Sequence, residues 1–165
     1  MSPGPAAAAA VLALALATAA GAAAQEAGGG PQAAAEEAAR PGTGDDWIDL
    51  RLDDMDRYAA RYRDAFVDEV ARYLEAPRAL VVDALGHGMR PGDVYYACAL
   101  ARASGRACRG LVEAWREDPG GGWPGVAERL GLAPDDLHRR VRDDIRASYR
   151  RWARPDGHLA PRRGR

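Results

Sequence analysis

The sequence predicts an all-α fold, because apolar residues recur at spacings of three and four along residues 53–152 and no segment sustains an alternation of period two. Glycine and proline interrupt this pattern often enough to divide it into about six helices. Of the 165 residues, 47% are hydrophobic, which suffices for one domain with a single core. We therefore expect a compact bundle of about six helices.

The first expected helix covers residues 53–75. Its apolar positions are Met55, Tyr58, Tyr62, Phe66, Val70 and Tyr73. Spacings of three and four place all of them on one stripe, so the segment is predicted to be a single helix. Asp53 or Asp54 can cap its start, and Pro77 prevents a smooth continuation past Ala76.

Two further helices are expected before Gly105. A short one has Pro77 in its first turn and ends at Gly86, which can adopt the left-handed conformation. The next one follows the loop that ends at Gly92, and its residues 94–101 are apolar on every side. Because a helix without a polar face is usually buried, we expect this helix at the centre of the domain.

The rest of the pattern predicts three helices. The first has an apolar stripe over residues 108–115 and is interrupted by the glycine-rich segment 118–122. A short helix then runs from Pro124 to Gly131, and the last helix starts at Pro134. The apolar stripe of the last helix consists of Leu137, Val141, Ile145, Tyr149 and Trp152.

A faint internal repeat relates residues 80–94 to residues 111–126. Each segment contains an apolar helix, a glycine-rich break, a proline near the next helix start and a valine within that helix. Two stacked helix-loop-helix units would explain the similarity. Chance similarity in a chain rich in glycine and proline explains it equally well.

Residues 1–24 have the pattern of a signal peptide. The segment Ala6–Ala24 contains no charge, and Ala22 and Ala24 fit an A-x-A cleavage site before Gln25. It is too short and too rich in alanine for a membrane span, so we expect no transmembrane segment in the mature chain. The first five residues lack Arg and Lys, which departs from the pattern, and a disordered alanine-rich leader is the alternative.

Three regions follow this leader. Residues 25–44 carry no aromatic or branched apolar side chain, and we expect a disordered linker rich in Ala, Gly and Pro. Residues 45–154 are expected to form the helical domain. Residues 155–165 are expected to form a basic flexible tail.

Charge is distributed unevenly along the domain. Residues 45–76 contain ten acids and five arginines, whereas residues 137–165 contain ten arginines and three aspartates. We expect the first and last helices to lie against each other with their charged flanks paired. The alternative is that the basic end, including residues 162–165, contacts an anionic partner, such as an acidic protein or a phospholipid surface. The expected partner of the protein is an unknown protein or an envelope component.

Cys98 and Cys108 are the only cysteines of the chain. In an antiparallel hairpin that turns at Gly105, the two residues would be offset by roughly 6 Å along the helix axes. The separation of the axes adds to this offset, and a disulfide requires Cα atoms within about 7 Å. We therefore expect two separate buried thiols, with a disulfide as the alternative that a steep helix crossing would allow.

A helix-turn-helix spacing occurs around Gly131. Ala127 and Leu137 occupy positions that this motif uses to pack its two helices. Any two tightly crossing helices need the same small and apolar residues. Asp135 and Asp136 would begin the recognition helix, where carboxylates repel the duplex. We therefore expect no nucleic-acid partner, and a cytoplasmic helix-turn-helix-like nucleic-acid-binding protein is the alternative.

The segments DVYYACALARASG, GGGW and VAERLG occur in this order between residues 76 and 137. This part of the chain resembles small exported bacterial helical proteins of unassigned function, which share an A…SG helix end followed by a G-W…A…LG segment. The resemblance implies an exported helical protein. It implies no catalytic residue, because the shared positions are packing residues.

Few side chains suggest a functional site. His87 lies in the loop GHGMRPG, and the sequence identifies no nucleophile or carboxylate that would be directed at it. Trp123 lies between three glycines and a proline, where it either closes the core or lines a groove. Arg139 and Arg140 are candidates for contact with a partner.

No acid–base pair, nucleophile constellation or metal-ligand spacing is visible, so we expect neither an enzyme nor a cofactor or metal. The patterns favour an exported protein, periplasmic or secreted, with a binding or structural role in the cell envelope.

Overall fold

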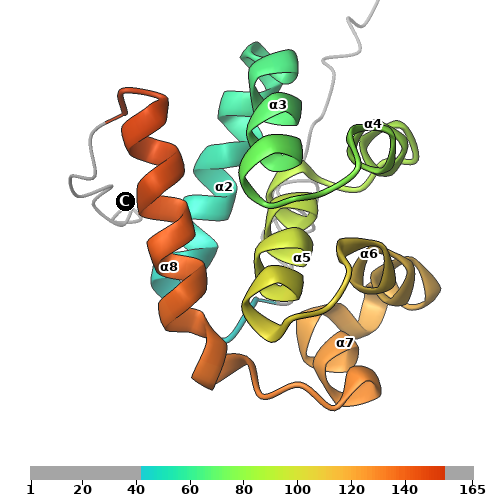
Figure 1. Ribbon diagram of the computed structural model, residues 1–165. Coiled ribbons are helices and arrows are strands. Elements are labelled where there is room, and N and C mark those ends of the chain that lie inside the picture. The colour runs from blue at the N-terminus through green and yellow to red at the C-terminus, as the bar shows by residue number, and fades with distance from the viewer. Residues whose placement is uncertain (1–41, 155–165) are drawn as a thin grey trace, which may run out of the picture.

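The computed structural model describes residues 42–154, and this part of the chain is all-α, as predicted (Figure 1). Its helices are α2 (Asp46–Arg61), α3 (Arg63–Tyr73), α4 (Arg78–Gly86), α5 (Pro91–Ser104), α6 (Cys108–Glu117), α7 (Gly122–Leu130) and α8 (Pro134–Arg151), with a 3-10 turn over Pro119–Gly121. The expected signal peptide, most of the linker and the tail lie outside the described residues. Within the described residues, no helix is both long enough and apolar enough to cross a membrane.

Helix α5 occupies the centre of the domain, as its uniformly apolar sequence predicts. Residues 92–101 are all buried. Helices α2 and α8 lie on one side of α5, and α4, α6 and α7 lie on the other (Figure 1). The two segments of the faint repeat each form helix, break and helix, namely α4–α5 and α6–α7.

The expected single helix over residues 53–75 is wrong, because two helices, α2 and α3, occupy this region. The backbone departs from helical geometry at Tyr62, where φ is −131° and ψ is 54°. Tyr62, at the break, and Tyr73, the last residue of α3, are 49% and 42% exposed. Met55 and Phe66 are buried as expected. Apolar spacing did not reveal the break, because one non-helical residue changes no spacing in the sequence.

The start of α2 differs from the prediction as well. Its N-cap is Asp45 rather than Asp53 or Asp54, and the helix begins at Asp46. Thr43, placed in the disordered linker by sequence, is buried, and its N–H donates to the Asp49 carboxylate at 2.9 Å. The domain therefore includes residues 42–44, because this side-chain acceptor lies on the first turn of α2.

Glycine ends two helices as predicted and a third one differently. Gly105 and Gly131 have φ of 70° and 59° and terminate α5 and α7 in the left-handed conformation. Gly86 was expected to do the same for α4, but it remains helical. The left-handed residue is Gly88, with φ of 83°. Pro77 precedes α4 as its N-cap and does not lie in its first turn.

The charged flanks of the first helices and of α8 pair with each other, which confirms the interpretation of the uneven charge. Asp45 contacts Arg142 at 2.5 Å, and Asp54 contacts Arg154 at 2.8 Å. The buried carboxylate of Glu69 accepts from Nε of Arg151 at 2.9 Å. These contacts join residues from the beginning and the end of the domain's sequence.

Tyr149 gives the domain a specific sensitivity to alkaline pH. Burial raises the pKa of its hydroxyl, and so does the Asp54 carboxylate, to which the hydroxyl donates at 2.7 Å. The unfolded chain releases this proton near pH 10 whereas the folded protein retains it, so stability falls as pH rises above about 10. When the pH is raised from about 10 to 11, the free energy of unfolding should fall by up to about 1.4 kcal/mol less in Tyr149→Phe than in wild type. Urea unfolding at the two pH values measures this difference. Equal losses in the two proteins would contradict the assignment.

Candidate functional site

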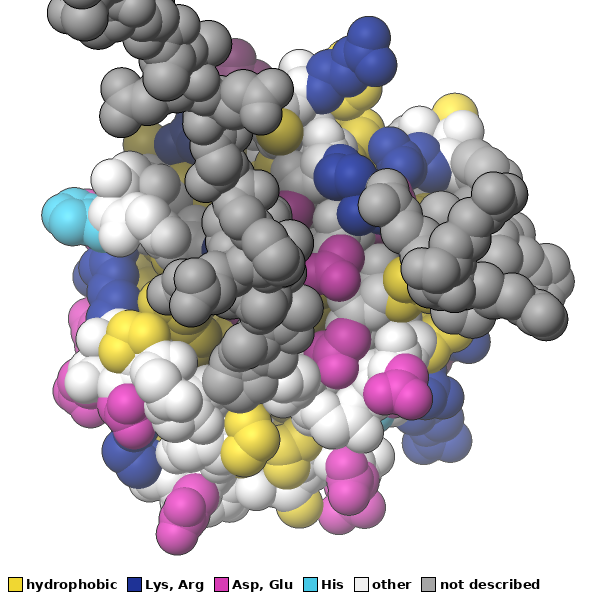
Figure 2. Space-filling view, turned by 180° about the vertical axis from the view of Figure 1, so that it is seen from behind, with side chains coloured by type: hydrophobic (Ala, Val, Ile, Leu, Met, Phe, Trp, Pro, Cys, Tyr) yellow, Lys and Arg dark blue, Asp and Glu magenta, His cyan; other side chains and the backbone are white. Residues whose placement is uncertain are grey.

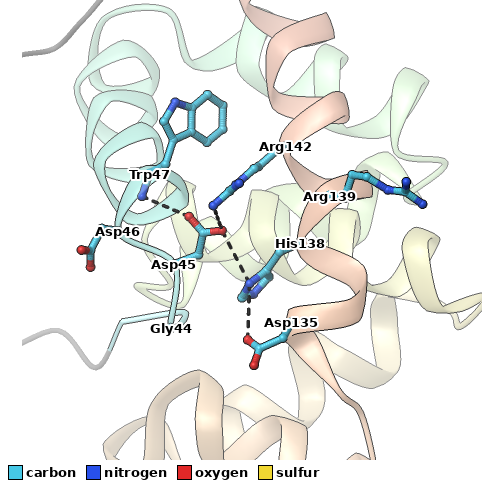
Figure 3. Close-up of a pocket in the computed structure, with 8 residues that line it drawn as sticks. All are labelled: Gly44, Asp45, Asp46, Trp47, Asp135, His138, Arg139 and Arg142. Carbon is cyan, nitrogen blue, oxygen red and sulfur yellow. Dashed lines mark hydrogen bonds and ion pairs between the residues drawn. The ribbon is translucent and has the colours of Figure 1, made fainter.

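A charged pocket of about 640 Å³ opens between the N-terminal ends of α2 and α8 (Figure 3). Its lining residues are Gly44, Asp45, Asp46, Trp47, Asp135, His138, Arg139 and Arg142. We call it the α2–α8 pocket. It combines side chains more than 85 residues apart in the sequence, because α8 packs against both α5 and α2.

Asp45 connects the two helices that form this pocket. Its Oδ1 accepts from the backbone N–H groups of Trp47 and Ile48, both at 3.1 Å, and thereby caps α2. Its Oδ2 lies 2.5 Å from Arg142 and 3.6 Å from Nδ1 of His138, both on α8. The two oxygens of one buried carboxylate thus serve two helices (Figure 3).

His138 lies between this carboxylate and the core. Its Nε2 is 3.0 Å from the hydroxyl of Tyr96, a fully buried residue of α5. Burial raises the pKa of the Tyr96 hydroxyl, so this hydroxyl stays protonated. The other ring nitrogen, Nδ1, faces two carboxylates of the pocket lining, at 3.6 Å from Asp45 and 3.7 Å from Asp135. The Asp45–His138–Tyr96 chain therefore links three helices.

The outer part of the pocket carries charged groups that are available to a ligand. Among the described residues, Asp46 and Arg139 have no ion-pair partner, and the Asp135 side chain is 94% exposed. The ring of Trp47 is covered by the guanidinium groups of Arg51, Arg142 and Arg146, with 5.0–6.0 Å between each and the ring centroid. The pocket therefore suits a polar or charged group and not a purely apolar one.

Replacing Asp45 separates its two contributions. Asp45→Ala removes the helix cap and the ion pair, and we expect a loss of about 2 kcal/mol in the free energy of unfolding. Asp45→Asn retains an oxygen that can cap α2 and should recover about 1 kcal/mol of this loss. Urea unfolding measures both. If the two variants were equally stable, the cap would contribute nothing.

Cys98 and Cys108 form a disulfide, so the expectation of two separate thiols is wrong. Their Cα atoms are 4.5 Å apart. The expectation assumed an antiparallel hairpin, but α6 crosses α5 steeply and is seen nearly end-on where α5 is seen from the side (Figure 1). Since Cys108 is the first residue of α6, the crossing brings it directly beside the middle of α5.

The sequence-predicted site residues do not converge. Trp123 is 2% exposed, donates its indole N–H to Asp93 at 3.0 Å and packs edge-on against Tyr96, so it closes the core and lines no groove. His87 is an exposed C-cap of α4, 3.2 Å from the Asp83 carboxylate, which also pairs with Arg116.

The two arginines belong to different pockets. Arg139 lines the α2–α8 pocket. Arg140 lines a smaller pocket with Arg102 and donates to the carbonyl of Ala103 at 3.0 Å, near the C-terminal end of α5. Only Arg139 therefore contributes to the candidate site.

The helix-turn-helix segment forms two helices, α7 and α8, with Gly131 at the turn. Asp135 and Asp136 are exposed in the first turn of α8, where this motif contacts DNA. Arg142 and Arg151 further along α8 are paired with carboxylates of the same molecule. This geometry gives the segment a packing role and does not favour DNA contact.

The residues that organise the pocket were not identified from the sequence. Asp45 and His138 are remote in the chain, and a lone histidine on a helix is most often an ordinary core or surface residue. One available signal was Asp45 itself, because an aspartate two residues before Trp47 fits an N-cap. Within residues 42–154, no group of three or more His, Cys, Asp or Glu side chains could hold a metal ion.

The fold and the site define a small all-α domain with one disulfide and a charged surface pocket. No protein-family model matches the chain, and no curated protein or solved structure matches it either. The resemblance to small exported helical proteins therefore stays a prediction.

Proposed function

We propose that the protein is exported to the periplasm or the medium and acts there as a disulfide-bonded helical domain with a binding or structural role in the cell envelope. The leader pattern in residues 1–24 directs the export. The α2–α8 pocket is the surface at which a polar partner would be bound.

The disulfide between Cys98 and Cys108 is the observation that carries this proposal. Disulfides persist in oxidising compartments and are rare in the cytosol of mesophiles. This one joins the central helix α5 to α6 and uses both cysteines of the chain. A leader with a cleavage pattern and a domain containing a disulfide support the same location independently.

The surface supports binding to a polar partner rather than to a polyanion. On the uncovered part of the face in Figure 2, acidic and basic side chains are interspersed. In the α2–α8 pocket, the exposed groups are Asp46, Asp135 and Arg139, which carry both signs of charge. A partner with a mixture of charges fits this surface better than a nucleic acid does.

Cell fractionation of a strain expressing the full chain tests the proposal. The expected result is a protein in the periplasm or the medium that starts at Gln25, as measured by intact mass and N-terminal sequencing. Replacing Ala22 and Ala24 with leucine should block cleavage and leave the precursor mass. Cytoplasmic protein that retains Met1 and two free thiols would overturn the proposal.

Reduction of the disulfide should lower the stability of the domain. The bridge closes a short loop, since ten positions separate the two cysteines, and its loss should cost about 2–3 kcal/mol. Urea unfolding with and without a dithiol reductant measures the difference. The double variant Cys98→Ala/Cys108→Ala should be insensitive to the reductant. An unchanged wild-type midpoint would show that the bridge adds nothing.

A further inference from the structure

A second groove, of about 520 Å³, lies beside α5 where α3 ends and α6 begins. Its lining comes from the segment that joins α3 to α4, from the second half of α5 and from the turn into α6. The buried disulfide fixes the start of α6 against α5 and thereby holds two of these segments together. This groove shares no lining residue with the α2–α8 pocket, so it is a separate site. We call it the arginine groove.

Basic side chains outnumber acidic ones three to one in the lining of the arginine groove. The arginines are Arg102, Arg106 and Arg109, and the single acid is Glu75; all four residues are exposed. The α2–α8 pocket differs, since its lining combines three aspartates with two arginines and a histidine. The potential at the arginine groove therefore favours a negatively charged ligand.

Contacts within the molecule neutralise these arginines only in part. Arg106 donates to a backbone carbonyl at 2.8 Å, and such a contact does not compensate its charge. Arg102 lies 3.4 Å from Asp144. Arg109 lies 3.7 Å from Glu113, and both of these side chains are more than half exposed. Ion pairs at the surface contribute little to stability, so a carboxylate of a ligand can compete for the arginines.

The start of α6 adds hydrogen-bond donors to this positive charge. Its N-cap is Ala107, and no side chain caps the first turn of the helix. The first N–H groups of a helix carry a partial positive charge and stabilise a nearby carboxylate. Ala107 and Arg109 are exposed and line the groove, so a carboxylate that pairs with the arginines lies beside these donors as well.

The shape and the surroundings of the groove favour a peptide segment over a small ion or a flat surface. The buried side chains of Leu74 and Ala101 give it an apolar floor. A small anion would leave this floor in contact with water, whereas apolar side chains of a peptide cover it. Glu75 and Glu113 stand beside the arginines, and their charges repel a broad anionic surface such as a phospholipid membrane.

We propose that the arginine groove binds an acidic segment of a partner protein, in which carboxylates alternate with small apolar side chains. The carboxylates pair with the arginines, whose planar guanidinium groups match a carboxylate with two parallel hydrogen bonds. The small side chains lie on the apolar floor. The binding is a property of the purified chain and does not depend on export.

Isothermal titration calorimetry of the purified full chain with a hexapeptide that alternates alanine and glutamate tests the proposal. We expect saturable binding that weakens at least about threefold when the salt concentration is raised from about 0.05 M to about 0.3 M. The matched peptide with glutamine in place of glutamate should not bind. Equal affinity for the two peptides would overturn the proposal.

Substitutions in the groove locate the site. Arg106→Ala and Arg109→Ala should each weaken binding about threefold, and the double variant about tenfold. Glu75→Gln removes the opposing charge and should strengthen binding about twofold. Arg139→Ala is the matched control, because Arg139 is an exposed arginine of the α2–α8 pocket, and it should leave the affinity unchanged.

The substitution Ala107→Asp separates loss of binding from loss of folding. Ala107 has the extended backbone of an N-cap, with φ of −78° and ψ of 134°. Aspartate should cap α6 and raise the urea midpoint of unfolding. Its carboxylate should also occupy the groove and weaken peptide binding at least about tenfold. Ala107→Asn caps the helix without a charge and should weaken binding less.

Two results would overturn the proposal besides equal affinity for the two peptides. One is peptide binding that the double arginine variant leaves unchanged. The other is sedimentation of the protein with phosphatidylglycerol vesicles in the absence of any binding to the acidic peptide, which would assign the arginines to a lipid surface. Neither result would alter the fractionation experiment that tests export.

Discussion

Replacing Glu69 with alanine is expected to lower the free energy of unfolding by about 2–3 kcal/mol, one of the two largest effects we expect from a single substitution. Glu69 is buried on α3, and its carboxylate accepts from Ser148 at 2.7 Å and from Nε of Arg151 at 2.9 Å. The Ser148 hydroxyl is also 2.7 Å from the hydroxyl of Tyr95. Alanine would leave the buried Ser148 hydroxyl without its carboxylate acceptor, and Arg151, whose side chain is 31% exposed, without its ion-pair partner.

The neighbouring residue provides a matched control for this substitution. Asp68 pairs with Arg78 at the surface, where both side chains are at least half exposed. Asp68→Ala should therefore cost less than about 1 kcal/mol. Glu69→Gln keeps the acceptor oxygen and the side-chain volume and should lie between the two alanine variants. Urea unfolding measures all three, and a loss for Glu69→Ala no greater than that for Asp68→Ala would contradict the role of the network.

Replacing Gly92 with alanine is expected to cost at least about 3 kcal/mol. A Cβ at this position would lie 2.7 Å from the carbonyl oxygen and 2.9 Å from the Cβ of Leu52 on α2. These are backbone and near-backbone atoms, so no side-chain rotation relieves the clash, and α2 and α5 must separate. The separation would also lengthen the bond from the Gly92 N–H to the Asp56 carboxylate, now 2.7 Å.

A second glycine serves as the control for this effect. Gly110 lies within α6, and a Cβ there would meet nothing within 4 Å. Gly110→Ala should stabilise the protein by about 0.5–1 kcal/mol, because alanine has the higher helix propensity. Opposite signs for Gly92→Ala and Gly110→Ala in thermal and urea unfolding are the expected result. A stabilised Gly92→Ala protein would show that the α2–α5 crossing is not close.

Much of the helical structure was predictable, because helix formation follows local patterns. The apolar run of residues 94–101 placed α5 at the centre, and Gly105 and Gly131 ended their helices as expected. The break at Tyr62 was not predictable from spacing. It depends on how α2 and α3 each pack on the core, and such contacts leave no periodic trace in the sequence.

The candidate site was largely not predictable. The uneven charge of the chain correctly indicated that its two ends pair, but it did not identify Asp45, His138 and Arg142 as the residues that meet. Of the four proposed contact residues, only Arg139 lines the α2–α8 pocket. The residues next to Trp123 in the sequence are compatible with a position in the core and with a position in a groove. In the structure its side chain is buried in the core and packs against Tyr96.

By itself, the sequence determined the α class, most helix ends and most of the apolar face of the helices, because these depend on residues three or four positions apart. The tertiary structure decided which helices cross, and at what angle. The steep crossing of α6 over α5 brought Cys98 and Cys108 to a Cα distance of 4.5 Å. The packing of α8 beside the first helices gave the buried carboxylates of Asp45 and Glu69 their partners, Arg142 and Arg151. Such pairings depend on the packing of whole helices, and no local pattern specifies them.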